Sequence, residues 1–170
     1  MEFNDVIRKR YACKRYGSEP VSDEALANIL EAGRVAPTAK NLQEQHVYVL
    51  RSAEALAKVD ELTPCRYGAP LVLMVAFDRE DVFTYPGGER TSGIEDATIV
   101  ATHLTLAAAN GGVDSCWINN FDPTRAAQVF DLPANEEVLM LLDLGHVAEG
   151  AGPLSNHGSR KPLDQTVTYL

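Results

Sequence analysis

The sequence predicts a three-layer domain in which helices cover both faces of a central sheet. Helix and strand patterns alternate along all 170 residues, with neither an internal repeat nor a low-complexity linker. Two apolar runs, at 70–78 and 136–145, predict strands buried on both faces. The segment 91–110 carries apolar or small residues almost all round, so we expect a buried helix at the centre. We expect one domain over residues 1–170.

The first half of the chain carries signals for three helices and one further strand, besides the buried strand at 70–78. A short helix is expected at 3–10, where apolar residues recur on one face and the last residues are basic. Ser22 can cap the start of a second helix, which Pro37 ends. The alternating, β-branched stretch 46–51 predicts a strand, and Ser52 then caps a third helix.

The second half contains the long helix, two strands and a short helix. Glycines at 111–112 end the long helix. The stretch SCWINNF, at 115–121, predicts a strand and a turn, after which Asp122 caps a helix with Pro123 at its first position. The tail at 152–170 has turn residues, basic groups and little apolar pattern. We therefore expect the tail to pack on a second subunit.

The charge balance of the chain favours a small-molecule partner. Its formal net charge is −9 and its pI about 4.8, which disfavours attraction to nucleic acid or anionic lipid. No apolar run reaches the roughly 18 residues of a membrane span, and the first residues lack the apolar core of a signal peptide. We expect a cytoplasmic protein that binds neither nucleic acid nor a membrane.

The cysteines and histidines form no recognisable reactive or metal-binding site. Cys13, Cys65 and Cys116 are odd in number and widely spaced, which supports neither a disulfide framework nor a zinc site. We expect each to be a small buried apolar group, with only Cys116 near a proposed site. His103 lies inside the long helix, where a core role is expected. Nucleotide-binding and hydrolase motifs are absent.

Basic, hydroxyl and amide groups occur at four separate stretches. In RYACKRY, an extended backbone would place Arg10 and Lys14 on one side, where two cations suit an anion. The loop APTAKNLQ, at 36–43, offers amides that can donate and accept along the edge of a planar heterocycle. The other stretches are the turn in WINN and the basic pair in SRKP, with Asn119, Asn120, Arg160 and Lys161. Taken singly, each is more typical of ordinary helix ends, loops and turns than of a binding site.

Taken in order along the chain, these stretches resemble the nitroreductase family of FMN-dependent homodimeric enzymes. The family pattern R-x-S-x-[RK]-x-[FY] corresponds here to RYACKRY, and A-P-S-x-x-N-x-Q to APTAKNLQ. PV, CWINNF and RKPL complete a resemblance that covers nearly the whole chain. It implies an α+β, nitroreductase-like fold: three layers, a central mixed sheet around a buried helix, and a C-terminal tail that extends onto the partner subunit.

The resemblance implies a binding site for FMN at the interface of a homodimer. Arg10 and Lys14 would hold the flavin phosphate and a pyrimidine oxygen, and Arg160 would reach the same phosphate. The loop at 36–43 would lie along the ribityl chain or ring edge. Backbone N–H groups of the WINN turn would face flavin N5 and O4. The full expected set is Arg10, Tyr11, Ala12, Lys14, Pro37, Thr38, Asn41, Gln43, Trp117, Ile118, Asn119, Asn120 and Arg160.

The implied reaction is a ping-pong transfer of hydride from NADH or NADPH through flavin N5 to a small-molecule electron acceptor. No side chain need act as acid or base. The acceptor stays open among nitroaromatics, quinones and enones. A flavin enzyme with other chemistry, such as reductive dehalogenation or azoline oxidation, is an alternative, and so is a noncatalytic flavin-binding or redox-sensing module.

Three departures from the family pattern are visible. Ala12 stands where the family usually has Ser, which removes a hydroxyl donor. Glu44 replaces the usual Pro after Gln43, so we expect a less restricted loop exit. The stretch 78–93 is short where larger members carry helices over the active site, and we expect it to set substrate choice.

Overall fold

A single four-stranded sheet organises the structure, a computed structural model that describes residues 1–170. The helices are α1 (Phe3–Lys9), α2 (Asp23–Arg34), α3 (Ala53–Leu62), α4 (Gly93–Asn110) and α5 (Pro123–Val129), and the strands are β1 (Gln45–Leu50), β2 (Leu71–Asp78), β3 (Asp114–Ile118) and β4 (Glu136–Gly145). Short 3-10 turns are η1 (Ala39–Asn41), η2 (Pro64–Arg66) and η3 (Leu163–Gln165). The predicted helices and strands are confirmed, with ends shifted by a residue or two.

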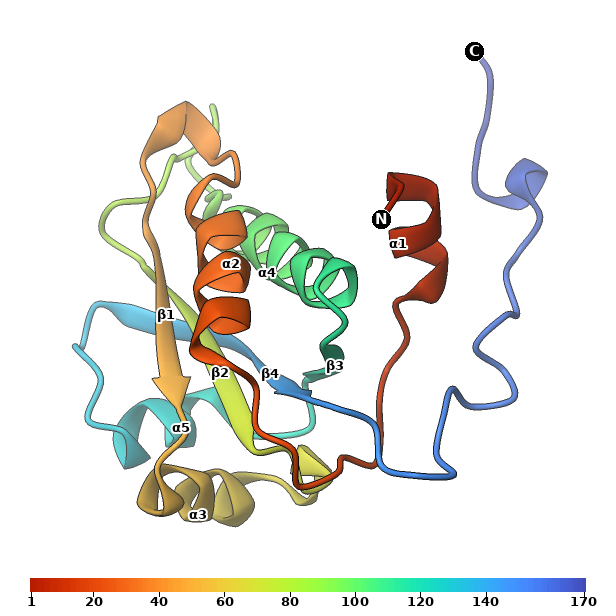
Figure 1. Ribbon diagram of the computed structural model, residues 1–170. Helices are drawn as coiled ribbons and strands as arrows, with labels where there is room; N and C mark the ends of the chain where they lie inside the picture. Colours follow the sequence, from red (N-terminus) through yellow and green to blue (C-terminus); the bar gives the residue numbers. More distant parts are fainter.

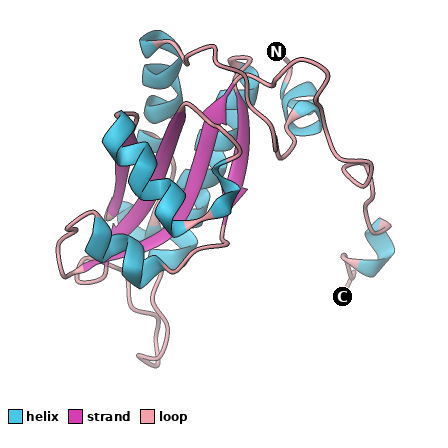
Figure 2. Ribbon diagram, turned by 90° about the horizontal axis from the view of Figure 1, so that it is seen from below, coloured by secondary structure: helices cyan, strands magenta, loops and turns pink.

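Helices cover both faces of the sheet, which confirms the three-layer prediction. Helices α2 and α4 pack on one face, where Ile29 and Val100 belong to the same core. Helices α3 and α5 pack on the other, where Val59 and Ala126 lie in a second core (Figures 1 and 2). Since both faces are covered, β2 is buried along nearly its whole length, as its continuous apolar run predicted.

The strand directions differ from the expected mixed sheet. The order is β1-β2-β4-β3, and each neighbouring pair is antiparallel. Parallel pairing is confined to an isolated bridge between Ala12 and Ser115, where the N-terminal segment runs beside edge strand β3. Strand direction depends on how the connections cross the ends of the sheet, and the apolar pattern of a buried strand carries no such information.

Side-chain caps begin three of the helices as predicted. The hydroxyls of Ser22 and Ser52 each accept a hydrogen bond from the backbone N–H three residues later, at the starts of α2 and α3. The Asp122 carboxylate accepts from two backbone N–H groups at the start of α5, which has Pro123 at its first position. These local contacts set where each helix starts.

Helix α4 is enclosed on one face only, in contrast to the expected buried helix. Its inner face lies so close to α2 that a Cβ added at Gly33 would lie 2.7 Å from Leu104 Cδ2. On its outer face Ile94 is 56% exposed and Ile99 36% exposed. His103 is only half-buried, which corrects its expected core role. Small and apolar residues on both faces cannot distinguish a face packed within the chain from one open to a second chain.

The last residues leave the body of the protein. From Gly152 onward only His157 is even partly buried, and η3 is the only helical turn. Figure 1 shows α1 beside the C-terminal end of α4 and the tail beyond α1, away from α3 and α5. No helix of the chain has the length and apolar character to cross a membrane.

Candidate functional site

The segment that follows α1 runs along the edge strand β3. Arg10 ends α1 in an extended conformation, and its N–H still donates to the Val6 carbonyl at 3.0 Å. The Cys13 N–H donates to the Ser115 carbonyl at 2.9 Å, next to the Ala12–Ser115 bridge. This pairing holds the basic N-terminal segment against the sheet.

Two cations of this segment have no carboxylate partner. Neither Arg10 nor Lys14 takes part in a salt bridge. Lys14 Nζ instead lies 5.8 Å from the centroid of the Tyr67 ring. Arg10 and Tyr11 line a cavity of about 330 Å³ beside the end of α4. Asp114 lines the same cavity, but Arg10 forms no ion pair with it. In a chain of net charge −9, an arginine without a carboxylate partner at a cavity suits an anion.

Arg160 of the tail lies close to the same segment. The rings of Tyr11 and His157 meet edge to face, with their centroids 6.1 Å apart. The Arg160 guanidinium donates to the His157 carbonyl and, at 2.7 Å, to the Ser159 carbonyl. Arg160 also lacks a carboxylate partner. The structure therefore connects the predicted Arg160 to the predicted Tyr11 through one residue of the tail.

The turn after β3 presents unused donors. Ile118 is buried, whereas Asn119 and Asn120 are exposed, and neither of their backbone N–H groups donates to another group. Trp117 Nε1 donates to Asn119 Oδ1 at 2.7 Å. Asn120 Nδ2 donates to Cys65 Sγ at 3.5 Å. The side chains thus hold the turn while its backbone donors face outward.

Cys65 joins this turn to the N-terminal segment, which corrects the expectation that only Cys116 lies near the site. Hydrogen bonds from Tyr67 and Asn120 lower the pKa of the Cys65 thiol, and the charge of Lys14 adds to this effect. Cys65 is only half-buried, so it is not the apolar core group that was expected. Cys116 does lie in the core, where burial raises the pKa of its thiol to about 12.

The loop at 37–43 is held in an uncommon backbone conformation. Lys40, Asn41 and Gln43 have φ values of 53°, 57° and 58°, in the left-handed region. The Gln43 N–H donates to Thr38 Oγ1 at 3.0 Å, and Gln43 Nε2 donates to the Asn41 carbonyl at 3.2 Å. Pro37 is exposed at the start of the loop. Thr38, Asn41 and Gln43 therefore stabilise each other within the loop.

The structure places this loop far from Arg10 and Lys14 within one chain. The Ala39 N–H donates to Asp96 Oδ1 at 3.0 Å, in the first turn of α4. The cavity at Arg10 is lined by Ala109, at the opposite end of α4. Asp96 and Ala109 are about 20 Å apart along the helix at about 1.5 Å per residue. Figure 1 shows the loop after α2 and the segment after α1 at opposite ends of α4.

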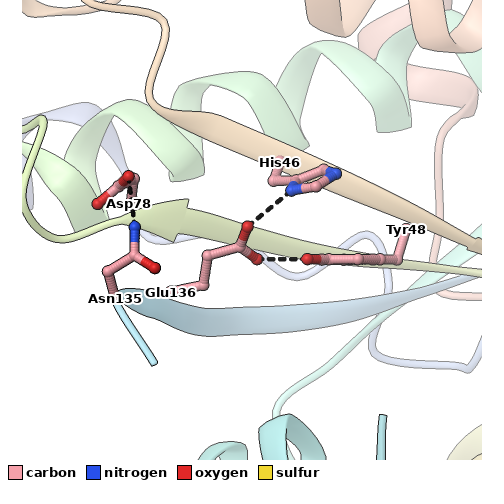
Figure 3. A network of polar contacts seen from close by, with 5 residues as sticks. All are labelled: His46, Tyr48, Asp78, Asn135 and Glu136. Atoms are coloured by element: carbon pink, nitrogen blue, oxygen red, sulfur yellow. Dashed lines mark hydrogen bonds and ion pairs between the residues drawn. The ribbon is translucent and has the colours of Figure 1, made fainter. Parts of the chain in front are cut away.

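A second polar network lies outside these groups. Glu136 accepts hydrogen bonds from Tyr48 at 2.6 Å and pairs with His46 Nδ1 at 2.7 Å (Figure 3). Glu136 lies on β4, opposite Asp78 of β2, and its partners lie on β1, so these contacts span the intervening strand β2. No group of residues in the chain forms a metal site. We regard this network as a structural tie between strands that are not neighbours.

Known proteins similar to this chain show which family it belongs to. The model of the nitroreductase family matches residues 7–65 and 63–146. The chain belongs to the nitroreductase family. A solved nitroreductase family protein from Clostridium difficile 630 superposes with a TM-score of 0.92 at 32% identity, covering 99% of this chain and 98% of that one. A nitroreductase from Desulfovibrio desulfuricans, solved in complex with FMN, has a TM-score of 0.82 and 26% identity, covering 100% of this chain and 97% of that one. YodC of Bacillus subtilis strain 168, named as an NAD(P)H nitroreductase, is 26% identical over 204 residues, covering 98% of both chains.

Sequence reasoning missed two parts of this nitroreductase-family chain. Cys65 and Tyr67 lie in a turn between helix and strand, where the only signal is the turn residues of TPCRYG. Glu44 and Asp96 form a buried pair behind the 37–43 loop. In the sequence, Asp96 is explained as an acid in the first turn of a helix, and Glu44 as a replacement of the family's usual Pro. Neither explanation reveals that the two side chains meet.

Proposed function

We propose that the protein is an FMN-dependent oxidoreductase that uses NADH or NADPH to reduce a small organic acceptor. The observation that carries this proposal is that three cations, Arg10, Lys14 and Arg160, lack carboxylate partners on the N-terminal segment and on the tail that contacts it. Lys14 lies near Cys65, which is bonded to the turn whose backbone N–H groups are free. Family membership, and relatives that bind FMN or carry NAD(P)H nitroreductase names, support the same conclusion.

The chemistry of these donors fits FMN. Arg10 and Arg160 can form charge-assisted hydrogen bonds to a phosphate, and Lys14 adds positive charge nearby. The free N–H groups of Asn119 and Asn120 suit the acceptor atoms on the edge of a flavin ring. Ala12 supplies no hydroxyl, so in our proposal the phosphate depends on these cations more than in family members with Ser at that position.

When bound, FMN would supply a ring that takes hydride from NADH or NADPH and then reduces a second substrate, so ping-pong kinetics are expected. The protein's own residues would bind the cofactor, orient it and shield one side of it. No histidine or carboxylate lies among the proposed binding groups, so no side chain is assigned as an acid or base. The short stretch 78–93 would border the acceptor and restrict its size.

A homodimer would bring the two separated groups together. The 37–43 loop and the Arg10 segment lie at opposite ends of α4, and an antiparallel pairing of α4 with its copy would bring each loop to the partner's basic segment. The outer face of α4 is suited to burial because Thr98, Thr102 and His103 form hydrogen bonds with carbonyls of their own helix. FMN would then lie at the interface.

The tail supports the same arrangement. Leu163, Tyr169 and Leu170 are among its most exposed apolar side chains, and they have no surface of their own chain to cover them. In a dimer the tail would extend onto the partner subunit, while Arg160 stays at the phosphate.

The first experiment is the visible spectrum of the purified protein, with any released cofactor identified by mass. Flavin absorption bands with the mass of FMN would support the proposal. A colourless protein that also fails to take up added FMN would contradict it. Steady-state oxidation of NADH or NADPH with menadione or nitrofurazone then distinguishes an enzyme from a flavin-binding module, which would turn over negligibly.

A further inference from the structure

Two buried carboxyl groups meet behind the 37–43 loop. Glu44 follows the loop and is 5% exposed, and Asp96 in the first turn of α4 is 4% exposed. The Glu44 carboxyl lies within hydrogen-bonding reach of the Asp96 carboxyl. The backbone of Glu44 is tied to the sheet, because its carbonyl accepts from the Asp78 N–H at 2.9 Å.

Donors for these carboxyl groups are scarce. Asp96 Oδ1 accepts from the Ala39 N–H at 3.0 Å. The remaining oxygens, Asp96 Oδ2 and both Oε atoms of Glu44, are buried and have no partner. Two ionised carboxylates in this arrangement would repel each other without compensation. One shared proton removes the repulsion and supplies a hydrogen bond between them.

The backbone conformation of the 37–43 loop depends on the groups that surround it. Three of its non-glycine residues, Lys40, Asn41 and Gln43, have positive φ, a conformation that persists only where neighbouring groups hold it. The acid pair meets the loop through Asp96, which accepts from the Ala39 N–H, and Glu44 directly follows the loop in the sequence. A movement of the Asp96 carboxyl, including one caused by repulsion from Glu44, would therefore loosen the loop.

We propose that Glu44 and Asp96 share one proton that keeps the 37–43 loop in its observed conformation, and that loss of this proton releases the loop. The pair acts by positioning the loop and takes no part in the chemistry. The consequence for flavin rests on the proposed function: a released loop would bind FMN more weakly, so that rising pH would lower the affinity for the cofactor.

The charges around the two carboxyl groups favour the protonated form that the proposal requires. Burial, together with the hydrogen bond and charge of Asp96 and the charge of Asp81 from the stretch after β2, raises the pKa of Glu44 to about 7. Lys40, the cation of the loop itself, has its Nζ 4.7 Å from the centroid of the Phe83 ring. Glu95, next to Asp96 on α4, is already paired with Arg90 and Tyr85. No cation is paired with either carboxyl.

Limited digestion with trypsin measures opening of the loop directly and needs no flavin, because Lys40, a trypsin cleavage site, lies inside the loop. The rate of cleavage after Lys40, followed by mass spectrometry, tracks the population of opened loop. The test variant is Glu44→Gln, which keeps a neutral hydrogen-bonding side chain at every pH. Glu24→Gln, which changes an exposed carboxylate on α2, is the matched control.

The measured quantity is the cleavage rate of the unmodified protein divided by the cleavage rate of Glu44→Gln. This ratio should rise by up to about tenfold between about pH 6 and about pH 8. Such a rise is expected for a group whose pKa is near 7 in the closed loop and lower in the open loop. The same ratio taken against Glu24→Gln should stay near one. A ratio to Glu44→Gln that does not change with pH would overturn the proposal. If Glu44→Gln does not fold, Asp96→Asn replaces it with the same expectation, since its amide oxygen can still accept from Ala39.

Titration with FMN separates this inference from the proposed function. The dissociation constant is measured from the fluorescence of free FMN at the same pH values. Weakening of up to about tenfold in the unmodified protein, absent in Glu44→Gln, would support both proposals. If FMN binds to neither protein at any pH, the proposed function fails, and the shared proton is judged by the cleavage ratio alone. FMN that binds with the same pH profile in both proteins would contradict the coupling of this proton to cofactor binding.

Discussion

Arg10 ends α1 without a carboxylate partner and lines the cavity beside α4, so its guanidinium is free to bind an anion. We expect Arg10→Ala to weaken FMN binding by about 1.5 to 3 kcal/mol, the contribution of a hydrogen bond to a charged group. Arg8→Ala, two residues earlier in the last turn of the same helix, is the control and should change the affinity little. Fluorescence titration measures both. An unchanged affinity for Arg10→Ala would remove this residue from the site.

Asp143 shows how a single buried acid makes stability depend on pH. It is 1% exposed and neither carboxyl oxygen has a partner. Burial raises the pKa of Asp143 to about 9, although the charge of Arg66 opposes the shift. A folded-state pKa above the unfolded value of 3.8 means that its contribution to stability is complete below pH 3.8 and is lost as the pH rises to about 9.

The corresponding prediction concerns Asp143→Asn, in which the titrating group is absent. The free energy of unfolding of the unmodified protein should fall, relative to that of Asp143→Asn, by roughly 1.4 kcal/mol per pH unit within this window. Urea denaturation at several pH values measures the difference. Asp5→Asn, on the exposed side of α1, should follow the unmodified protein. Parallel curves for Asp143→Asn and the unmodified protein would show that Asp143 is ionised throughout.

At the scale of elements, the contact between α4 and β2 leaves no room for a side chain at the start of the helix. A Cβ at Gly93 would lie 2.3 Å from Phe77 Cε2. Gly93→Ala should therefore lower the free energy of unfolding by about 1 to 3 kcal/mol, despite the better helix propensity of Ala. Gly111→Ala, at the other end of α4, meets nothing closer than 3.4 Å and should cost less than about 0.5 kcal/mol. Similar values for the two variants would contradict this packing.

At the scale of the whole molecule, the proposed dimer depends on the outer face of α4. Each chain has a mass of 18.5 kDa, so light scattering distinguishes one chain from two. Ile94, 56% exposed on this face, becomes a buried contact in the proposed dimer. Ile94→Glu should give the mass of a single chain and lose FMN at the same time, because a buried, unpaired charge opposes association.

Val49→Glu provides the control for this prediction. Val49 is 37% exposed on the edge strand β1, outside α4, and its substitution should leave both the mass and the bound FMN unchanged. A single-chain mass for the unmodified protein with FMN still bound would contradict an interface site.

Short-range chemistry explains what could be predicted from the sequence. The starts of α2, α3 and α5 follow from Ser22, Ser52 and Asp122, whose caps act within three residues. The two-sided burial of β2 follows from its continuous apolar run. The cations and amides of the candidate site were also identifiable one by one, because their residue types suit phosphate and heterocycle binding.

Only the tertiary structure decided which of these groups meet. The length of α4 separates the 37–43 loop from Arg10, so that one chain does not assemble the whole predicted set. The antiparallel order of the strands and the contact between Glu44 and Asp96 likewise depend on long-range packing. By itself the sequence determined the family, the elements and the chemical character of the candidate residues. Their juxtaposition, and the proton we infer between two carboxyl groups, depend on contacts between residues far apart in the chain, which local patterns do not encode.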